Sequence, residues 1–209
     1  MKACTHLAVL LATVLAFRAD RKIFAPPPAA HAKSYPAHES HDDEMVSVAI
    51  DPFDTPGKAR IFRINYREKG FLPIRLIISN DSDQNLLLND LRIEYITVKR
   101  DKIEPATTDD IYRREAHPKQ NLSAAHEKVP VTKDADVVET VDELDQAQFV
   151  ANPVGPHSTC SGFLFLDIGG PAAPEAGAHV YLAGLKIGRK ELFYFDIPLE
   201  KYLNSQPGK

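Results

Sequence analysis

The fold of this protein is decided by residues 71–98, which read FLPIRLIISNDSDQNLLLNDLRIEYITV. Apolar side chains alternate with other side chains over residues 71–79 and again over 91–98, with a polar break between them. Successive side chains of a strand point to opposite faces of its sheet, so this period of two predicts two paired strands with one buried face. The pattern therefore indicates an antiparallel β domain rather than a helical or nucleotide-binding one.

Similar patterns occur on both sides of this stretch. Further strands are expected at residues 46–50, 59–66, 86–89, 148–151, 158–168, 178–187 and 191–198. Turns rich in Gly, Pro, Asn and Asp separate these segments. About eight short strands with frequent turns predict an all-β fold. We expect an immunoglobulin-like antiparallel β-sandwich, with a barrel-like closure of the strands as the alternative.

One segment departs from this pattern, and we expect a short helical insert there, at about residues 104–147. Residues 107–110 read TTDD, and hydroxyl and acidic side chains favour the first turn of a helix. A first helix is therefore expected over 108–116, ending before Pro118. A second helix is expected over 134–147, where the apolar residues follow helical spacing.

The N-terminus has the pattern of an export signal. Lys2 supplies a positive charge, and residues 7–17 form an apolar run of 11 residues. Such a run suits the core of a signal peptide and is too short to cross a bilayer. We therefore expect residues 1–19 to be a signal peptide. The mature protein is then exported, to the periplasm or the extracellular space, without a transmembrane segment.

The remaining chain divides by composition. Residues 20–44 contain the run APPPAA and several His, Ser and acidic residues without apolar periodicity, which predicts a disordered Pro/His-rich linker. The β-sandwich domain is expected over 45–203, followed by a C-terminal tail at 204–209. With 209 residues, of which 44% are hydrophobic, the chain is long enough for one domain with a packed core.

Charge and cysteine content restrict the function. The net charge of −4 argues against a nucleic-acid partner, because phosphate contacts need an excess of basic side chains. Cys4 lies within the expected signal peptide, so Cys160 is the only thiol left and no disulfide framework is expected. Cys160 stands in a strand pattern, which favours a small buried side chain over a reactive thiol.

The densest group of metal-capable side chains lies in the expected linker, over residues 31–43. His38 and His41 stand three residues apart among Glu and Asp residues, with His31 upstream. Imidazoles and carboxylates bind Zn, Cu or Ni, so a metal-binding or metal-delivery protein is one alternative function. A flexible linker holds no ligand in place, so a solvated linker is favoured and no metal residue is assigned.

Other patterns favour structural roles over chemical ones. Residues 80–85 offer oxygen ligands but lack the Gly and the distal Glu of a calcium loop, so they favour an ordinary turn. Asn80 and Asn121 begin N-glycosylation acceptor patterns. Ser158 and Ser161 lie outside any nucleophile motif, so no catalytic or cofactor-binding residue is assigned. A hydrolase with an unrecognised site is the second alternative.

Residues 70–82, which read GFLPIRLIISNDS, carry a resemblance to a known class. This apolar strand, followed by Asn and small polar residues, resembles exported bacterial immunoglobulin-like β-sandwich domains over about residues 59–105. The resemblance implies the fold and carries no catalytic residue. These patterns together predict a non-catalytic, exported binding or structural module of the cell envelope. Its expected partner is an envelope or extracellular protein, contacted at exposed strand edges and at the insert.

Overall fold

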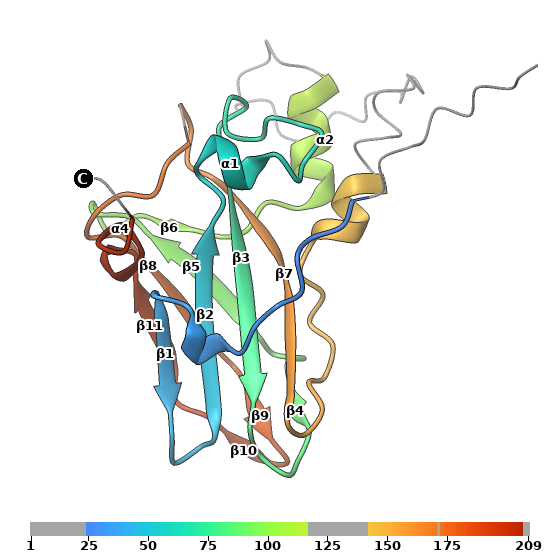
Figure 1. Cartoon of the computed structure of the whole chain (residues 1–209), viewed down its shortest axis with the longest axis vertical. Helices are drawn as coiled ribbons and strands as arrows, with labels where there is room; N and C mark the ends of the chain where they lie inside the picture. Colours follow the sequence, from blue (N-terminus) through green and yellow to red (C-terminus); the bar gives the residue numbers. More distant parts are fainter. Residues whose placement is uncertain (1–23, 117–141, 171, 207–209) are drawn as a thin grey trace, which may run out of the picture.

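A computed structural model describes residues 24–116, 142–170 and 172–206 of the chain (Figure 1). These residues form eleven strands in three antiparallel sheets, together with a few short helices. The predominantly β structure that the sequence predicted is therefore confirmed, with more strands than the eight expected. The described strands form open sheets, so the barrel-like closure is wrong for this part of the chain.

Two of the sheets have four strands each. Sheet A has the order β1-β2-β3-β7, with β1 (His38–His41), β2 (Val46–Pro52), β3 (Phe71–Asn80) and β7 (Ser158–Asp167). Sheet C has the order β11-β8-β5-β6, with β11 (Phe195–Pro198), β8 (His179–Ala183), β5 (Arg92–Ile96) and β6 (Lys102–Ile103). The small sheet B has the order β10-β9-β4, with β10 (Lys190–Glu191), β9 (Lys186–Ile187) and β4 (Leu86–Leu87).

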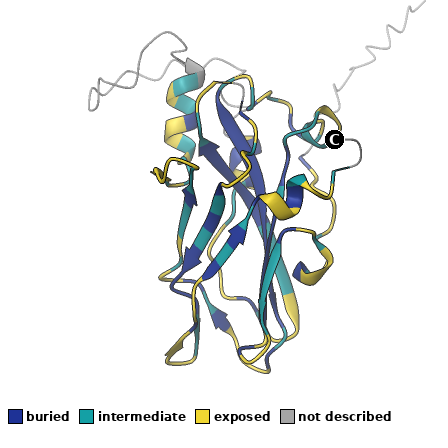
Figure 2. Cartoon of the chain, turned by 90° about the vertical axis from the view of Figure 1, so that its left-hand side faces the viewer, coloured by how far each residue is buried: buried dark blue, intermediate teal, exposed yellow. Residues whose placement is uncertain are grey.

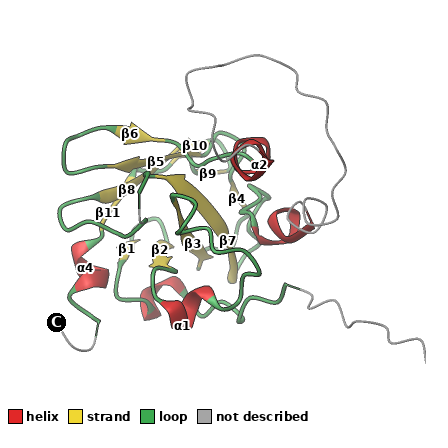
Figure 3. Ribbon diagram, turned by 90° about the horizontal axis from the view of Figure 1, so that it is seen from above, coloured by secondary structure: helices red, strands yellow, loops and turns green. Residues whose placement is uncertain are grey.

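The helical elements are short and lie outside the sheets (Figure 3). They are η1 (Ala32–Ser34), α1 (Pro56–Ala59), α2 (Thr108–Ala116), the helical residues 142–147 and α4 (Glu200–Leu203). The bounds of α2 agree with the predicted helix, and Thr107 accepts the Asp110 N–H while the Asp110 carboxylate accepts from Thr107. This reciprocal cap is the reason that the TTDD signal was reliable.

The main core lies between sheets A and C, and buried residues run along the strands that enclose it (Figure 2). Alternate residues of β3 enter this core: Leu72, Ile74, Leu76 and Ile78. Sheet C contributes inward-facing residues from three strands: Tyr95, Val180, Leu182, Phe195 and Ile197. The period of two in the sequence therefore correctly identified the inward faces of β2, β3 and β5.

The predicted pairing of residues 71–79 with 91–98 is wrong. Strand β3 pairs with β2 and β7, whereas β5 pairs with β6 and β8 in the other four-stranded sheet. The connection crosses from one sheet to the other through β4. Strand periodicity defines which residues share a face and carries no information about the neighbouring strand, so it did not reveal this crossing.

Sheet A is covered on both faces along β3, and every residue of β3 is buried. On the outer face, Phe163 and Phe165 of β7 pack in an aromatic cluster with Phe53, Phe62 and Tyr66. None of the buried clusters formed by the described residues lies on the outer face of sheet C. The two sheets therefore have different surroundings.

The strand expected at 59–66 is wrong. Thr55 accepts the Lys58 N–H and Pro56 occupies the first turn, so helix α1 begins there and turns follow it. Ile61 and Phe62 are adjacent and both contact the aromatic cluster, whereas a strand would place them on opposite faces.

The linker expected at 20–44 is wrong for residues 24–44. This segment contains η1 and β1, and Ala32 and Ala37 are fully buried. Its small side chains allow close approach to the sheet, so it is ordered without the apolar periodicity on which the prediction relied.

The signal peptide expected at 1–19, most of the second helix expected at 134–147 and the end of the expected tail lie outside the described residues. No helix in the described ranges has the length and apolar character needed to cross a membrane.

Candidate functional site

The most exposed aromatic residues of the described chain follow β10, in residues 192–194, which we call the aromatic loop. Phe193 is 73% exposed and Tyr194 is 54% exposed, whereas Leu192 is buried. The Tyr194 ring lies 5.3 Å from the Tyr181 ring of β8, centroid to centroid. Aromatic side chains are enriched at protein–protein interfaces, and adjacent exposed rings are uncommon on a free surface. The aromatic loop is therefore the candidate contact site.

Carboxylates from the N-terminal part of the domain fix the backbone of the aromatic loop. The Phe193 N–H donates to Glu44 Oε2 at 3.2 Å, and the Asp196 N–H donates to Glu39 Oε2. The Leu192 N–H donates to the Leu185 carbonyl at 2.8 Å. Hydrogen bonds before, within and after the exposed rings hold this loop in one conformation.

His41 lies between the two carboxylates that hold the loop. Its Nδ1 is 3.2 Å from Glu44 Oε2, and its Nε2 is 3.4 Å from Glu39 Oε1. Its ring stacks on Phe195, with 4.0 Å between ring centroids and 10° between ring planes. His41 therefore connects β1 to β11, where the edges of sheets A and C meet.

Glu44 remains an acceptor for the loop because it is ionised. Burial of its carboxylate opposes ionisation, but contacts with Lys190, His41 and the Phe193 N–H together outweigh burial and lower the pKa of Glu44. Lys190 Nζ lies 3.1 Å from Glu44 Oε1. Because of the lowered pKa, Glu44 stays ionised and keeps its contact with the loop at pH values where an ordinary glutamate would already be protonated.

The histidines considered as metal ligands take structural positions. His31 Nε2 lies 2.9 Å from Asp81 Oδ1, and His38 Nδ1 lies 2.6 Å from the Tyr35 carbonyl oxygen. His41 braces the aromatic loop as described above. No three metal-capable side chains of the described residues lie close enough together to hold an ion. The alternative of a metal-binding tether therefore finds no assembled site in residues 31–43.

The loop at 80–85 is organised by Asn80, which is fully buried. Its amide donates to the carbonyls of Gln84, Val154 and Gly155, and its Oδ1 accepts from the N–H and Oγ of Ser82. These bonds confirm a turn held by Asn side-chain contacts, although it does not join paired strands. The buried Asn80 amide is not accessible for glycosylation, and Asn121 lies outside the described residues.

The candidate nucleophiles also have structural surroundings. Cys160 packs against the main core, and burial raises the pKa of its thiol to about 11. Ser161 Oγ accepts from Arg75 Nη2 at 2.9 Å, and Ser158 Oγ donates to the Pro156 carbonyl. The Cys160 thiol is therefore protonated at neutral pH, which disfavours a thiol mechanism.

A pocket of about 450 Å³ lies beside β7, between the start of α2 and residues 148–149. Thr108 Oγ1 donates to Gln148 Oε1 across it at 3.0 Å, and Thr107 bonds to Asp110. These polar groups satisfy one another, so the lining does not direct a set of free polar groups at a common point. The pocket therefore provides weaker support for a functional site than the aromatic loop does.

Comparison with protein-family models, with curated proteins and with solved structures finds no match to this chain. The geometry of the aromatic loop is therefore the main indication of function. The sequence did not reveal this loop, because residues 191–198 were expected to form one strand. The signal was present, since Leu192, Phe193, Tyr194 and Phe195 are consecutive apolar residues and a strand with one buried face cannot bury all four.

Proposed function

We propose that this protein is a non-catalytic binding module of the cell envelope that contacts a partner protein through its aromatic loop. The observation that carries the proposal is Phe193, a 73% exposed phenylalanine on a backbone held by two buried or partly buried carboxylates. Exposing this ring to water is unfavourable, and a partner that covers it removes that cost.

The rigidity of the loop supports a binding role. A loop whose backbone is already fixed loses little conformational entropy on association, so more of the contact energy appears as affinity. Large aromatic anchors with such support are typical of the few residues that dominate an interface. The Tyr194 ring extends the surface towards Tyr181 on the outer face of sheet C.

We also propose an immunoglobulin-like sandwich and an exported location. Two antiparallel four-stranded sheets that share one core support the fold, as does the resemblance carried by residues 70–82. The pattern of a positive residue and a short apolar run within residues 1–19 supports export. The periplasm and the extracellular space both fit this proposal.

A capture experiment tests the binding role. The chain lacking residues 1–19 is immobilised beside a double variant, F193S with Y194S, and a control variant, V98S. Val98 is 53% exposed and lies outside the aromatic loop. We expect the wild type and V98S to retain the same envelope protein and the double variant to lose it at least tenfold. Equal recovery by all three folded proteins contradicts the proposal.

A further inference from the structure

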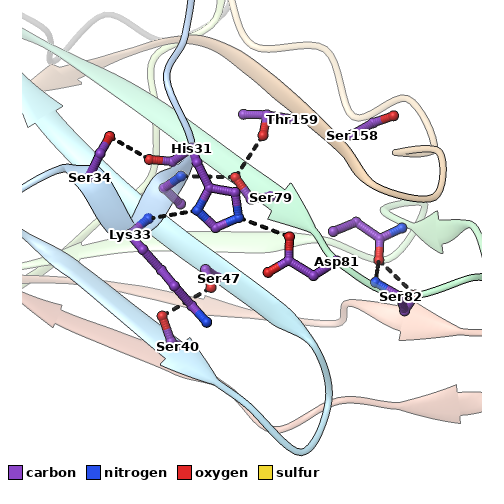
Figure 4. A network of polar contacts seen from close by, with 12 residues as sticks. His31, Lys33, Ser34, Ser40, Ser47, Ser79, Asp81, Ser82, Ser158 and Thr159 are labelled. Carbon is purple, nitrogen blue, oxygen red and sulfur yellow. Dashed lines mark hydrogen bonds and ion pairs between the residues drawn. The ribbon is translucent and has the colours of Figure 1, made fainter.

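Residues 24–35, which we call the N-terminal strap, lie across the outer face of sheet A (Figure 1). Ala32 is fully buried and packs with Ala49 of β2 and Ile77 of β3. Its N–H donates to Ser79 Oγ at 2.9 Å, as the close-up in Figure 4 shows. The strap therefore contacts the sheet through its backbone and small side chains.

The face beneath the strap carries a row of small hydroxyl side chains. Ser40, Ser47, Ser79 and Thr159 occupy matching register positions on the four neighbouring strands of sheet A. Ser40 Oγ donates to Ser47 Oγ at 3.0 Å, and Ser79 Oγ lies 2.8 Å from Thr159 Oγ1 (Figure 4). These small hydroxyl side chains let another backbone approach closely and offer it hydrogen-bond partners.

A buried arginine lies at the same face. Arg75 is 4% exposed, and it donates to the Pro27 carbonyl at 2.6 Å and to Ser161 Oγ. No carboxylate in the described ranges forms an ion pair with it, and Asp51, opposite it in register, pairs with Lys58 instead. A buried charge with neutral partners alone is costly, and a carboxylate is the strongest partner for a guanidinium.

The strap is held by few strong contacts. Its cluster with sheet A contains only three buried residues, and the ion pairs of His31 with Asp81 and of Lys33 with Asp42 are partly or largely exposed. Exposed pairs of this kind contribute little to stability. Phe24 is the one large side chain of the strap that is buried, and it stacks on Phe62 in the aromatic cluster, while Tyr35 is only partly buried. Segments with few buried apolar contacts open at lower free energy than the core does.

We propose that this face of sheet A is a second binding site, for an extended acidic segment of a partner protein that displaces the strap. Arg75 takes a carboxylate of the incoming segment in place of the Pro27 carbonyl, and Ser79 accepts one of its backbone N–H groups. The inference rests on the strap and not on the aromatic loop. Each site is therefore testable without the other.

The test uses the full chain carrying A32E, because a large charged side chain does not fit between Ala49 and Ile77 and frees the strap. The control is K33Q, at an exposed position of the same segment. The probes are labelled peptides of residues 24–36 with the natural sequence, with P27Q and with P27E. Fluorescence anisotropy measures their binding, and circular dichroism verifies that each protein is folded.

We expect all three peptides to bind A32E at least tenfold more tightly than the wild type or K33Q, because the natural strap competes in those proteins. On A32E, the P27E peptide should bind about five- to tenfold more tightly than the P27Q peptide, since an ionic hydrogen bond replaces a neutral one. Adding R75Q to A32E should remove this difference.

Three results overturn the proposal. Global unfolding of A32E shows that the strap is an integral part of the core. Equal affinity of the P27E and P27Q peptides for A32E shows that Arg75 does not select a carboxylate. Failure of every peptide to bind a folded A32E protein shows that the face is not a binding site. If the protein carrying R75Q does not fold, the affinities of the P27E and P27Q peptides for A32E alone decide whether the site selects a carboxylate.

Discussion

The outer faces of the two four-stranded sheets differ in how far they are covered by other parts of the chain. On sheet A, the aromatic cluster and the N-terminal strap cover the outer face, and all of β3 is buried. On sheet C, the outer positions of β5 carry Arg92, Glu94 and Ile96, all exposed or half-buried. Both sheets use the same inward alternation. The two sheets therefore differ in the residues of their outer faces, which are covered by other segments on sheet A and are open to solvent or a partner on sheet C.

The largest expected effect is a difference in unfolding free energy between substitutions on the two outer faces. F163A removes a buried ring of the aromatic cluster on sheet A and should lower the free energy of unfolding by about 3–5 kcal/mol. Y181A on the outer face of sheet C should cost about 1 kcal/mol or less, because its ring is only half-buried. Guanidinium denaturation measures both values. Equal losses contradict the distinction between the faces.

The next effect concerns the edge of sheet A. A Cβ added to Gly162 would lie 2.4 Å from Phe149 Cα, a backbone atom of the segment beside β7. G162A should therefore destabilise the protein by about 1–3 kcal/mol through overpacking. The matched variant G57A meets no atom within 4 Å and should leave the melting temperature unchanged or slightly raised. A tolerated G162A substitution would show that the segment does not press against β7.

A smaller effect concerns the carboxylate beneath the aromatic loop. The pKa of Glu44 is lowered in the folded protein, so its ionised form adds stability that is present above the ordinary value of 4.5 and is lost as the pH falls through the folded value. E44Q should therefore lose less stability than the wild type on acidification from pH 6 towards pH 3. D83N changes a carboxylate whose side chain is 93% exposed and serves as the control. Thermal melts over this range measure the slopes, and parallel slopes for wild type and E44Q would exclude this role.

The smallest effect on stability is expected at the aromatic loop itself. F193S combined with Y194S should change the free energy of unfolding by about 0.5 kcal/mol or less, because both rings are already mostly exposed. The same double variant should lose partner binding. A large loss of stability would instead mean that these rings support the fold, and the aromatic loop would no longer be the preferred contact site.

Local patterns predicted much of the fold. The ten-residue strand β3 and helix α2 were expected almost to the residue, because alternation and the Thr107–Asp110 cap act within a few residues. The short strand at 86–89 was also expected and is β4. The candidate site was not predicted, because the hydrogen bond that fixes the Phe193 N–H is accepted by Glu44, far away along the chain.

The sequence alone determined the β class, the inward faces of β2, β3 and β5 and the position of α2, because these follow from the spacing of neighbouring side chains. Only the tertiary structure decided that β3 and β5 belong to different sheets and that residues 24–44 join the fold. Strand pairing and the docking of a polar segment depend on partners distant in the chain. A strand's own periodicity carries no information about which distant segment will meet it.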